Sequence, residues 1–213
     1  MKRPGSAVSP ADLRTVRVAR QAIHHASGGV AAYELLFRQL SPDTLIDEAA
    51  HEAATAQVLL SVFGDFGVDD LAGELPLFVN TTRGFLVGDL PLPGGPDRLV
   101  VEVLEHVVLD AQVLDGLSAL IGAGYRVAAD DWDGCSSRDP LIRVCDVVKI
   151  DMAAVGRVAL PRLVARAHAL RPGITICVER VEDAEDVALA VAAGADLLQG
   201  YALHRPQTRT TRT

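Results

Sequence analysis

Short apolar runs alternate along this chain with longer stretches in which apolar residues recur every three or four positions. Eight of the short runs have the length and the β-branched or large apolar residues that are typical of strands. They cover residues 16–24, 30–38, 75–82, 98–105, 125–131, 146–152, 174–180 and 195–203. The first two runs are separated by the short stretch "HASGG", which predicts a hairpin and therefore an antiparallel pair.

The longer stretches predict amphipathic helices between the later strands. They cover residues 45–67, 110–124, 160–173 and 182–195. Asp183 is the expected N-cap of the last helix, and three of the stretches end at glycine, as helices commonly do. Repeated strand–helix units indicate an α/β fold whose parallel strands close into a barrel. We expect one domain over residues 15–206, with flexible ends at 1–14 and 207–213, where polar residues lack periodicity.

Composition limits the partners and the location that can be expected. Apolar residues make up 49% of the 213 positions and charged residues 23%, as in a soluble globular protein. The net charge of −8 argues against DNA or RNA polymer as the main partner, because binding a polyanion requires basic patches. The three cysteines lack a CxxC spacing and are expected to be reduced thiols. The sequence shows no secretory leader and no apolar run of about 18 residues, which predicts a cytoplasmic protein with no membrane partner.

A polar side chain lies in or directly after nearly every predicted strand. In a barrel of this kind, the chemistry is carried at the carboxyl ends of the strands. Taken singly, a strand glutamate usually lies on a solvated face, an asparagine caps a strand end, and a glutamine before glycine belongs to a turn. Their recurrence at the same place in successive strands favours a shared site. The residues concerned are Glu34, Asn80, Glu102, Asp130, Asp131, Lys149, Glu179 and Gln199.

Converging carboxylates at these positions predict a divalent-cation site. Five of the residues are acidic, Glu182 follows in the next turn, and Lys149 is the one base, so the set carries a charge of −5. Such a group can stay ionised only if cations enter or the pKa values rise strongly. Mg²⁺ and Mn²⁺ favour carboxylate and amide oxygens, and two ions would nearly neutralise the set. Asp130 and Asp131 can both face one site only where a strand ends, and one of them could then bridge two metals that clamp a phosphoryl displacement.

With these residues in place, the chain resembles the EAL domain family of bacterial cyclic di-GMP phosphodiesterases. "YELLFR" (33–38) is similar to the family signature, with Leu35 at its alanine position, and "EVLE" (102–105) is similar to its E-x-x-E motif. "DD" at 130–131 matches the double aspartate that opens the family's catalytic loop. The other matching segments are "FVNTT" (78–82), "VKID" (148–151), "VERVE" (178–182) and "QGYALHRP" (199–206). The resemblance covers residues 16–206 and implies a modified TIM (β/α)8 barrel with an antiparallel first strand.

The resemblance implies metal-dependent hydrolysis of cyclic di-GMP to linear pGpG. Two ions, Mg²⁺ or Mn²⁺, would be held by oxygen ligands, one of which is shared. The ligands implied for the first ion are Glu34, Asn80, Glu102 and Asp130. The ligands implied for the second ion are Asp130, Asp131 and Glu179. The catalytic residues implied by the family are Glu34, Asp131, Lys149 and Glu179.

The family also assigns residues that bind the substrate or support the site. Lys149 would orient water or neutralise charge, and Arg38 would contact a substrate phosphate. Gln199 and Glu182 would lie in the binding site. Glu105 would hold the catalytic loop. Members of the family often pair through helices near that loop, so the resemblance leaves a homodimer open.

Two positions depart from the family pattern. The loop "DDWDGCSS" is one residue shorter than the family's D-D-F-G-T-G-Y-S-S and has Asp133 in place of a glycine, and Arg180 replaces the glycine of A-E-G-V-E. "YELLFR" and this altered loop are most similar to the EAL part of the EAL–HDOD group. Trp132 in this loop could stack on a guanine or pack against the barrel rim. Three functions stay open: an active phosphodiesterase, an EAL module that binds cyclic di-GMP or a protein partner without turnover, and an unrelated barrel enzyme with a carboxylate-rich metal site.

Overall fold

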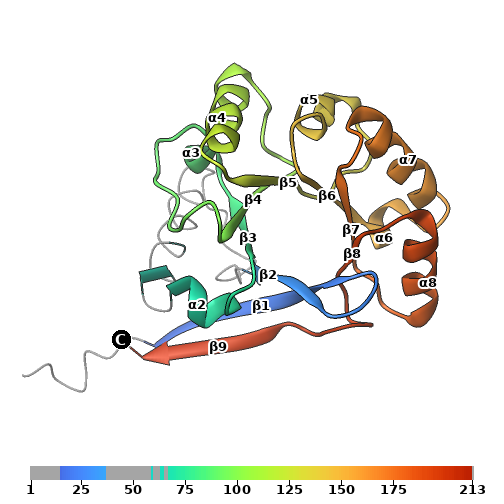
Figure 1. The fold of residues 1–213 in the computed structure, drawn as a ribbon, viewed down its shortest axis with the longest axis horizontal. Helices are drawn as coiled ribbons and strands as arrows, with labels where there is room; N and C mark the ends of the chain where they lie inside the picture. The colour runs from blue at the N-terminus through green and yellow to red at the C-terminus, as the bar shows by residue number, and fades with distance from the viewer. Residues whose placement is uncertain (1–14, 37–58, 60–62, 65–66, 213) are drawn as a thin grey trace, which may run out of the picture.

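The computed structural model describes residues 15–36, 59, 63–64 and 67–212, and these form a closed eight-stranded barrel with helices along part of its outside (Figure 1). The barrel confirms the predicted α/β fold. Each of its strands overlaps one of the eight apolar runs of the sequence. The strands are β1 (Thr15–His25), β2 (Val30–Leu36), β3 (Leu77–Thr81), β4 (Leu99–Val103), β5 (Arg126–Ala129), β6 (Val147–Asp151), β7 (Thr175–Glu179) and β8 (Leu197–Leu198).

β1 closes the barrel. It pairs antiparallel with both β2 and β8, whereas the neighbours from β2 through β8 are parallel. The antiparallel β1–β2 hairpin was predicted from the short connection between the two runs, and the structure confirms it.

A ninth strand covers residues 207–212 of the tail predicted at 207–213. β9 (Gln207–Arg212) pairs antiparallel with the first half of β1, over Thr15–Arg20 (Figure 1). The first half of β1 extends past β8 and leaves an edge of backbone groups that need partners, which the threonine-rich end of the chain supplies. The residues were polar enough to appear unstructured, because a strand on the outside of the barrel needs no apolar face.

The helices lie outside the barrel, as the spacing of apolar residues predicts. They are α2 (Gly67–Ala72), α3 (Arg83–Leu86), α4 (Ala111–Gly122), α5 (Asp139–Ile142), α6 (Met152–Val155), α7 (Leu160–Leu170) and α8 (Ala184–Ala193), with a 3-10 turn η2 (Ser136–Arg138). Asp183 caps α8 as predicted, because its carboxylate accepts the Asp186 N–H, and Gly194 ends that helix in the left-handed conformation (φ 98°). The predicted helix over 45–67 falls largely outside the described residues, and Arg38 and residues 1–14 fall outside them entirely.

Two layers of side chains fill the barrel interior. The lower layer is apolar and buried, and consists of Ile23, Ala32, Phe78, Val100, Ala128, Val147, Cys177 and Leu197. Successive side chains of a strand point to opposite faces, so the residue two positions further along each parallel strand faces inward as well. These next positions are Glu34, Asn80, Glu102, Asp130, Lys149, Glu179 and Gln199. Because side-chain direction alternates along each strand, a ring of polar side chains, here called the polar ring, lies next to the apolar layer inside the barrel.

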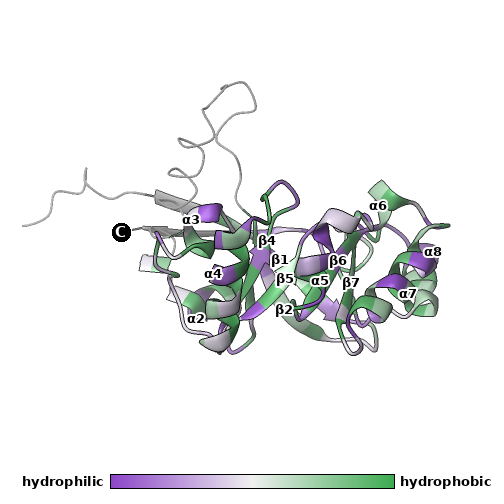
Figure 2. Ribbon diagram, turned by 90° about the horizontal axis from the view of Figure 1, so that it is seen from above, coloured by the Kyte–Doolittle hydropathy of each residue, from purple (hydrophilic) through white to green (hydrophobic). Residues whose placement is uncertain are grey.

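The main hydrophobic core lies between the barrel and its helices. Strand residues such as Val101 and Val148 pack there with Val113 and Leu117 of α4 and with Val164 of α7. In Figure 2 the central strands are mostly hydrophobic, whereas the helices combine hydrophobic and hydrophilic residues. Within the part of the chain that is described, none of the helices has the length and apolar character needed to cross a membrane.

Candidate active site

Lys149 lies at the centre of the polar ring. Its ammonium Nζ is 2.6 Å from Glu102 Oε1, 2.9 Å from Asp130 Oδ1 and 3.0 Å from Glu179 Oε1. Glu34 Oε2 is further away, at 3.6 Å. The Lys149 side chain is 1% exposed and that of Glu102 is fully buried. One ammonium thus faces four carboxylates, from β2, β4, β7 and the residue directly after β5, which are called the acidic ring below. They leave an excess of negative charge when all are ionised.

The pKa values of the ring reflect this crowding. Burial raises the pKa of Glu102 well above its usual value, and Lys149 opposes this only in part because Glu34 and Asp130 add repulsion. Burial likewise raises the pKa of Glu179, to about 8, against the lowering effect of Lys149. Burial alone would lower the pKa of Lys149, but the surrounding carboxylates outweigh it and the net pKa is raised well above normal. The lysine stays charged, and part of the acidic ring holds protons at neutral pH.

Amide side chains fix Glu34 within the ring. Gln199 Nε2 donates to Glu34 Oε2 at 2.6 Å, and Asn80 Nδ2 lies at a longer 3.5 Å from Glu34 Oε1. Gln199 Nε2 is also 3.3 Å from Gln21 Oε1, and Gln21 donates to the His204 carbonyl. Gln21 was not predicted from the sequence. Because β1 is antiparallel to its neighbours, its inward-facing polar residue comes two positions before the inward-facing apolar residue, Ile23, and not two positions after it.

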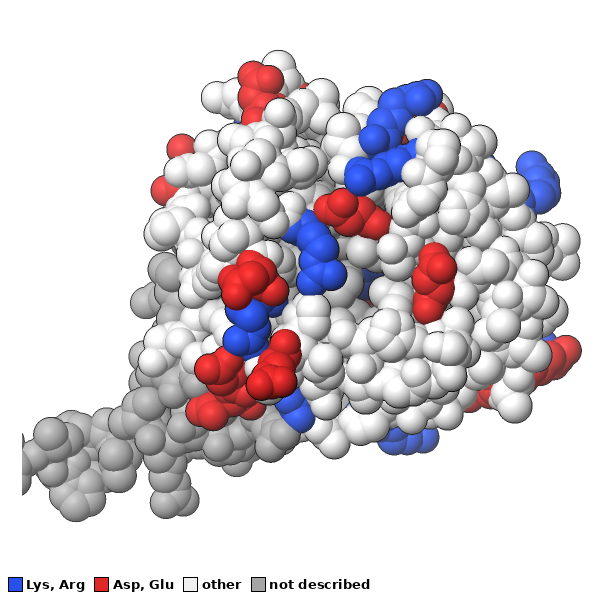
Figure 3. All heavy atoms as spheres, in the orientation of Figure 1, with Lys and Arg blue, Asp and Glu red and all other residues white. Residues whose placement is uncertain are grey.

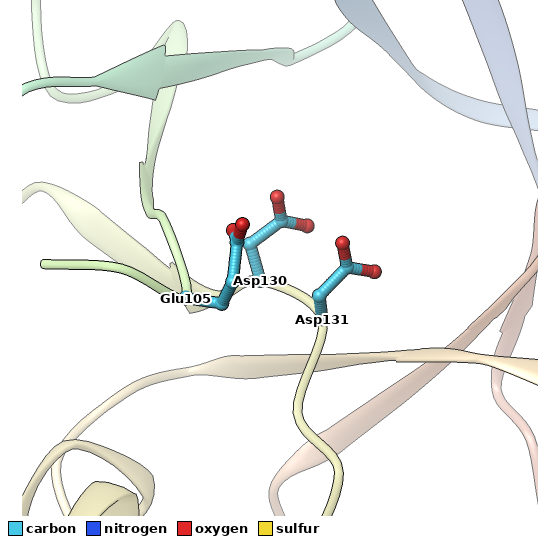
Figure 4. Close-up of side chains that lie close together, drawn as sticks. All are labelled: Glu105, Asp130 and Asp131. Atoms are coloured by element: carbon cyan, nitrogen blue, oxygen red, sulfur yellow. The ribbon is translucent and has the colours of Figure 1, made fainter. Parts of the chain in front are cut away.

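Asp130 and Asp131 come together with Glu105 at the ends of β5 and β4. One carboxylate oxygen of each lies within 4.8 Å of the others, and Figure 4 shows the three side chains grouped there. Burial raises the pKa of Asp131 to about 6, and repulsion from Asp130 and Asp151 adds to the rise. The backbone of Asp131 is left-handed (φ 44°), which turns its side chain toward the same region as Asp130 just after the strand ends. The structure therefore groups Glu105, for which the family resemblance implies a loop-holding role, with the two aspartates.

A cavity of about 430 Å³ opens above the ring. Figure 3 shows acidic and basic side chains around a hollow near the middle of the molecule. The residues that line the cavity are Gln21, Glu34, Leu36, Asp130, Asp131, Lys149, Asp151, Glu179, Arg180, Glu182, Gln199, Gly200 and Tyr201. All predicted site residues except Asn80, Glu102 and Arg38 are among them; Asn80 and Glu102 lie beside or beneath it, and Arg38 is outside the described residues.

The loop after Asp131 is held by the buried side chain of Trp132 despite its shorter length. Trp132 is 1% exposed and belongs to the main core, so the prediction that it could stack on a guanine is wrong and the packing alternative holds. Among the described residues, the non-glycine positions with positive φ are Asp131 and Arg180, so the backbone at Asp133 does not require the glycine that the family has there. Gly134 supplies the left-handed turn (φ 89°), and a Cβ at this position would collide with Leu163.

Arg138 anchors this loop, which no sequence pattern indicated. Its guanidinium is buried and donates to the carbonyls of Val103 at 3.1 Å, Leu104 at 3.0 Å and Val107 at 2.9 Å. A longer contact, 3.4 Å, reaches the Glu105 carbonyl. Arg138 therefore ties the end of the loop after β5 to the segment that carries Glu105.

The donor set of the ring fits a divalent cation. Among the described residues, Asn80 Oδ1, Glu102 Oε2 and Gln199 Oε1 are buried side-chain oxygens without a hydrogen-bond partner. Buried oxygens are rarely left unpaired, and unpaired ones indicate a missing water or ion. Carboxylate and amide oxygens are the ligands that Mg²⁺ and Mn²⁺ prefer. The excess negative charge and the unpaired oxygens both fit a divalent cation.

We expect the metal-free domain to lose stability as the pH rises. The pKa of Asp131 is about 6 and that of Glu179 about 8, whereas such groups titrate at roughly 4 in an unfolded chain. The folded state thus keeps protons that the unfolded chain releases, so the stability is complete below roughly pH 4 and is lost as the pH rises through 6 and 8. The melting temperature in EDTA should be lower at pH 8.5 than at pH 5, and Mn²⁺ should raise it most at pH 8.5.

Two variants separate this effect from a general response to pH. Asp131→Asn should weaken the pH dependence, whereas Glu74→Gln, at an exposed site before β3, should leave it unchanged. A metal-free melting temperature that is equal or higher at pH 8.5 would contradict the account.

The closed barrel and its acidic ring define the class of α/β-barrel proteins with an oxygen-rich site at the carboxyl ends of the strands. Residues 89–206 match the EAL domain. The chain belongs to the EAL domain family.

Two curated relatives align with most of the chain. The uncharacterized protein YuxH of Bacillus subtilis is 29% identical over 197 residues, which are 90% of this chain and 47% of YuxH. The cyclic di-GMP phosphodiesterase CdgJ of Vibrio cholerae is 28% identical over 195 residues, which are 92% of this chain and 45% of CdgJ. The chain thus spans about half the length of the curated relatives it matches.

Solved structures share the fold. Klebsiella pneumoniae BlrP1, in a complex with calcium and cyclic di-GMP, superposes with a TM-score of 0.73 at 23% identity, over 96% of this chain and 63% of BlrP1. An EAL domain protein from Listeria monocytogenes gives a TM-score of 0.65 at 21% identity, over 89% of this chain and 87% of that protein. BlrP1 has also been solved with manganese and cyclic di-GMP.

Proposed function

We propose that this domain is a metal-dependent phosphodiesterase that hydrolyses cyclic di-GMP to linear pGpG. The observation that carries the proposal is the acidic ring at the floor of the cavity, where four carboxylates surround Lys149 and further oxygens lack partners. Membership of the EAL family, the phosphodiesterase relative CdgJ and the metal and cyclic di-GMP complexes of BlrP1 support it.

The residues divide into two sets of ligands for Mg²⁺ or Mn²⁺. Glu34, Asn80, Glu102 and Asp130 would hold one ion. Asp130, Asp131 and Glu179 would hold the other, and Glu105 is close enough to Asp130 and Asp131 to add to this set. When bound, the ions would neutralise the carboxylates, activate the attacking water and stabilise the negative charge on the phosphate.

The remaining ring residues position these ligands and the substrate. Lys149 keeps the carboxylates of Glu102, Asp130 and Glu179 close together and supplies a fixed positive charge beneath the phosphate. Gln199 orients Glu34 through its short hydrogen bond. Arg38 would contact a substrate phosphate, and Glu182 lines the cavity where the nucleotide would enter.

A second function, binding of cyclic di-GMP without turnover, is favoured by one observation. Arg180 occupies a position where the family has glycine, directly beside Glu179, and it places a guanidinium at the mouth of the cavity. Its guanidinium, 3.3 Å from Asp151 Oδ2, adds a positive charge to the cavity and so disfavours the binding of metal ions there. The shorter loop argues less strongly, because Gly134 and Arg138 keep it folded.

Incubation of the purified protein with cyclic di-GMP and Mg²⁺ or Mn²⁺ tests the two functions together. If the domain is an enzyme, we expect pGpG as the product, identified by chromatography and mass. If it binds cyclic di-GMP without turnover, we expect a calorimetric binding signal and no product. No binding and no product would contradict both.

The same proposal includes two metal ions, a cytoplasmic location and no DNA or RNA polymer as a partner. It leaves a homodimer open.

A further inference from the structure

The backbone at Arg180 is held in a conformation that suits glycine. Its φ is 54°, in the left-handed region that a long side chain adopts only at a cost. The next residue, Val181, is fully buried, donates its N–H to the Gln199 carbonyl and accepts from the Ala202 N–H. Gly200 packs so tightly against Val181 that a Cβ on Gly200 would collide with its backbone. The turn is therefore fixed by its neighbours, and Arg180 must accept the strain.

The contacts of Arg180 do not offset that cost. Its side chain is 62% exposed, and its Nη1 is 3.3 Å from Asp151 Oδ2. Because the guanidinium is mostly exposed to water, this one contact to the buried Asp151 carboxylate contributes little to stability. Asp151 is already engaged, since its other oxygen caps α6 by accepting the N–H groups of Ala153 and Ala154. The Asp151 contact orients the guanidinium rather than stabilising the fold.

Arg180 is also the accessible cation of the cavity. Among the described residues that line it, Lys149 and Arg180 are the basic ones, and Lys149 is buried among four carboxylates. The acidic residues that line the cavity are Glu34, Asp130, Asp131, Asp151, Glu179 and Glu182. A dinucleotide carries two phosphates, and the one that lies away from the acidic ring would meet these negative charges. Among the described residues that line the cavity, Arg180 is the exposed cation that can receive it.

We propose that Arg180 binds a phosphate of the dinucleotide at the mouth of the cavity, the one that does not lie over the acidic ring. The inference rests on the proposed binding of cyclic di-GMP. A guanidinium suits this task because it can donate two parallel hydrogen bonds to a phosphate while Asp151 holds its remaining donor side. Replacement of the family's glycine thus adds a phosphate contact at the cost of backbone strain.

Three substitutions of Arg180 test this inference by calorimetry with cyclic di-GMP and Ca²⁺, at low and at high salt. Arg180→Asn removes the charge but tolerates the left-handed backbone, and Arg180→Gly also relieves the strain. Both should weaken binding about fivefold to tenfold in low salt, and the difference from wild type should shrink at about 1 M salt. Arg180→Lys should fall between wild type and Arg180→Asn. Arg126→Asn, a loss of the same charge at the exposed start of β5, should leave the Kd unchanged.

Stability separates a binding role from a structural one. Arg180→Gly should melt at the same temperature as wild type or above it, while binding more weakly. The inference is overturned if Arg180→Asn and Arg180→Gly bind as wild type does at low salt, or if weaker binding always accompanies a lower melting temperature. If the wild-type protein binds no cyclic di-GMP, the proposed function fails, and the inference fails with it.

Discussion

Replacing Lys149 with methionine is expected to destabilise the domain by about 3–5 kcal/mol at pH 8, the cost of removing one partner from a buried ion-pair network. The ammonium is the positive charge at the centre of four carboxylates, and it is 1% exposed. Methionine has a similar length and leaves little space unfilled, so the loss of stability comes from the missing charge and not from poorer packing. The free energy of unfolding, measured by denaturation in guanidinium chloride at pH 8, gives its size.

The effect of Lys149→Met should depend on pH in a defined direction. Burial already raises the pKa values of Glu102 and Glu179, and loss of the ammonium raises them further. The folded variant would therefore hold protons that its unfolded chain releases, so it is most stable in acid and loses stability as the pH rises. We expect a markedly smaller difference from wild type at pH 5 than at pH 8.

Arg157→Met is the matched control for this variant. Arg157 contacts Asp183, Glu185 and Asp186, but its own side chain and those of Asp183 and Glu185 are exposed, and Asp186 is the buried partner. Removing it should cost much less than removing Lys149, and the cost should change little between pH 5 and pH 8. Equal losses for the two variants, or a Lys149→Met loss that is the same at both pH values, would contradict the account of the ring.

Glu34→Ala is expected to reduce turnover of cyclic di-GMP by about a thousandfold or more, because a metal ligand in such sites contributes several kcal/mol to the reaction. Glu34 lines the cavity, accepts from Gln199 Nε2 and lies 3.6 Å from Lys149. Its removal leaves one carboxylate fewer for a cation. Steady-state kinetics with Mn²⁺ and calorimetric titration with Mn²⁺ should both show the loss.

A carboxylate elsewhere shows whether the loss is specific to the site. Glu74→Ala changes the same charge at an exposed position before β3, away from the carboxyl ends of the strands, and should retain wild-type turnover. Equal turnover in Glu34→Ala and wild type would remove Glu34 from the proposed mechanism. A melting temperature measured for each variant ensures that the comparison is made on folded protein.

Much of the site could be predicted because a barrel strand alternates strictly. Each inward-facing apolar residue, such as Val100 or Cys177, is followed two positions later by a polar one, here Glu102 and Glu179, and this repetition is visible in the sequence. Gln21 was missed because β1 runs in the opposite direction and reverses the order. The central place of Lys149 depends on the closure of the barrel, which brings distant strands together and which no single segment contains.

Other features depend on contacts that leave no pattern in the sequence. Arg138 acts through backbone carbonyls of a segment more than thirty residues away, and carbonyls are present in every sequence. β9 is polar because it lies on the outside of the barrel, and so it lacks the apolar alternation that identifies the other strands. The burial of Trp132 likewise follows from the packing of the loop against the helices.

The most direct test of the central claim is the formation of pGpG from cyclic di-GMP as a function of divalent metal. Purified protein is stripped with EDTA, assayed, and then titrated with Mn²⁺ or Mg²⁺ while the product is followed by chromatography. We expect no product in EDTA, product that rises with added metal, and product formation about a thousandfold slower or more from Glu34→Ala at every metal concentration. Binding of cyclic di-GMP with metal present, but without pGpG from the wild-type protein, would contradict the enzyme and leave the binding module.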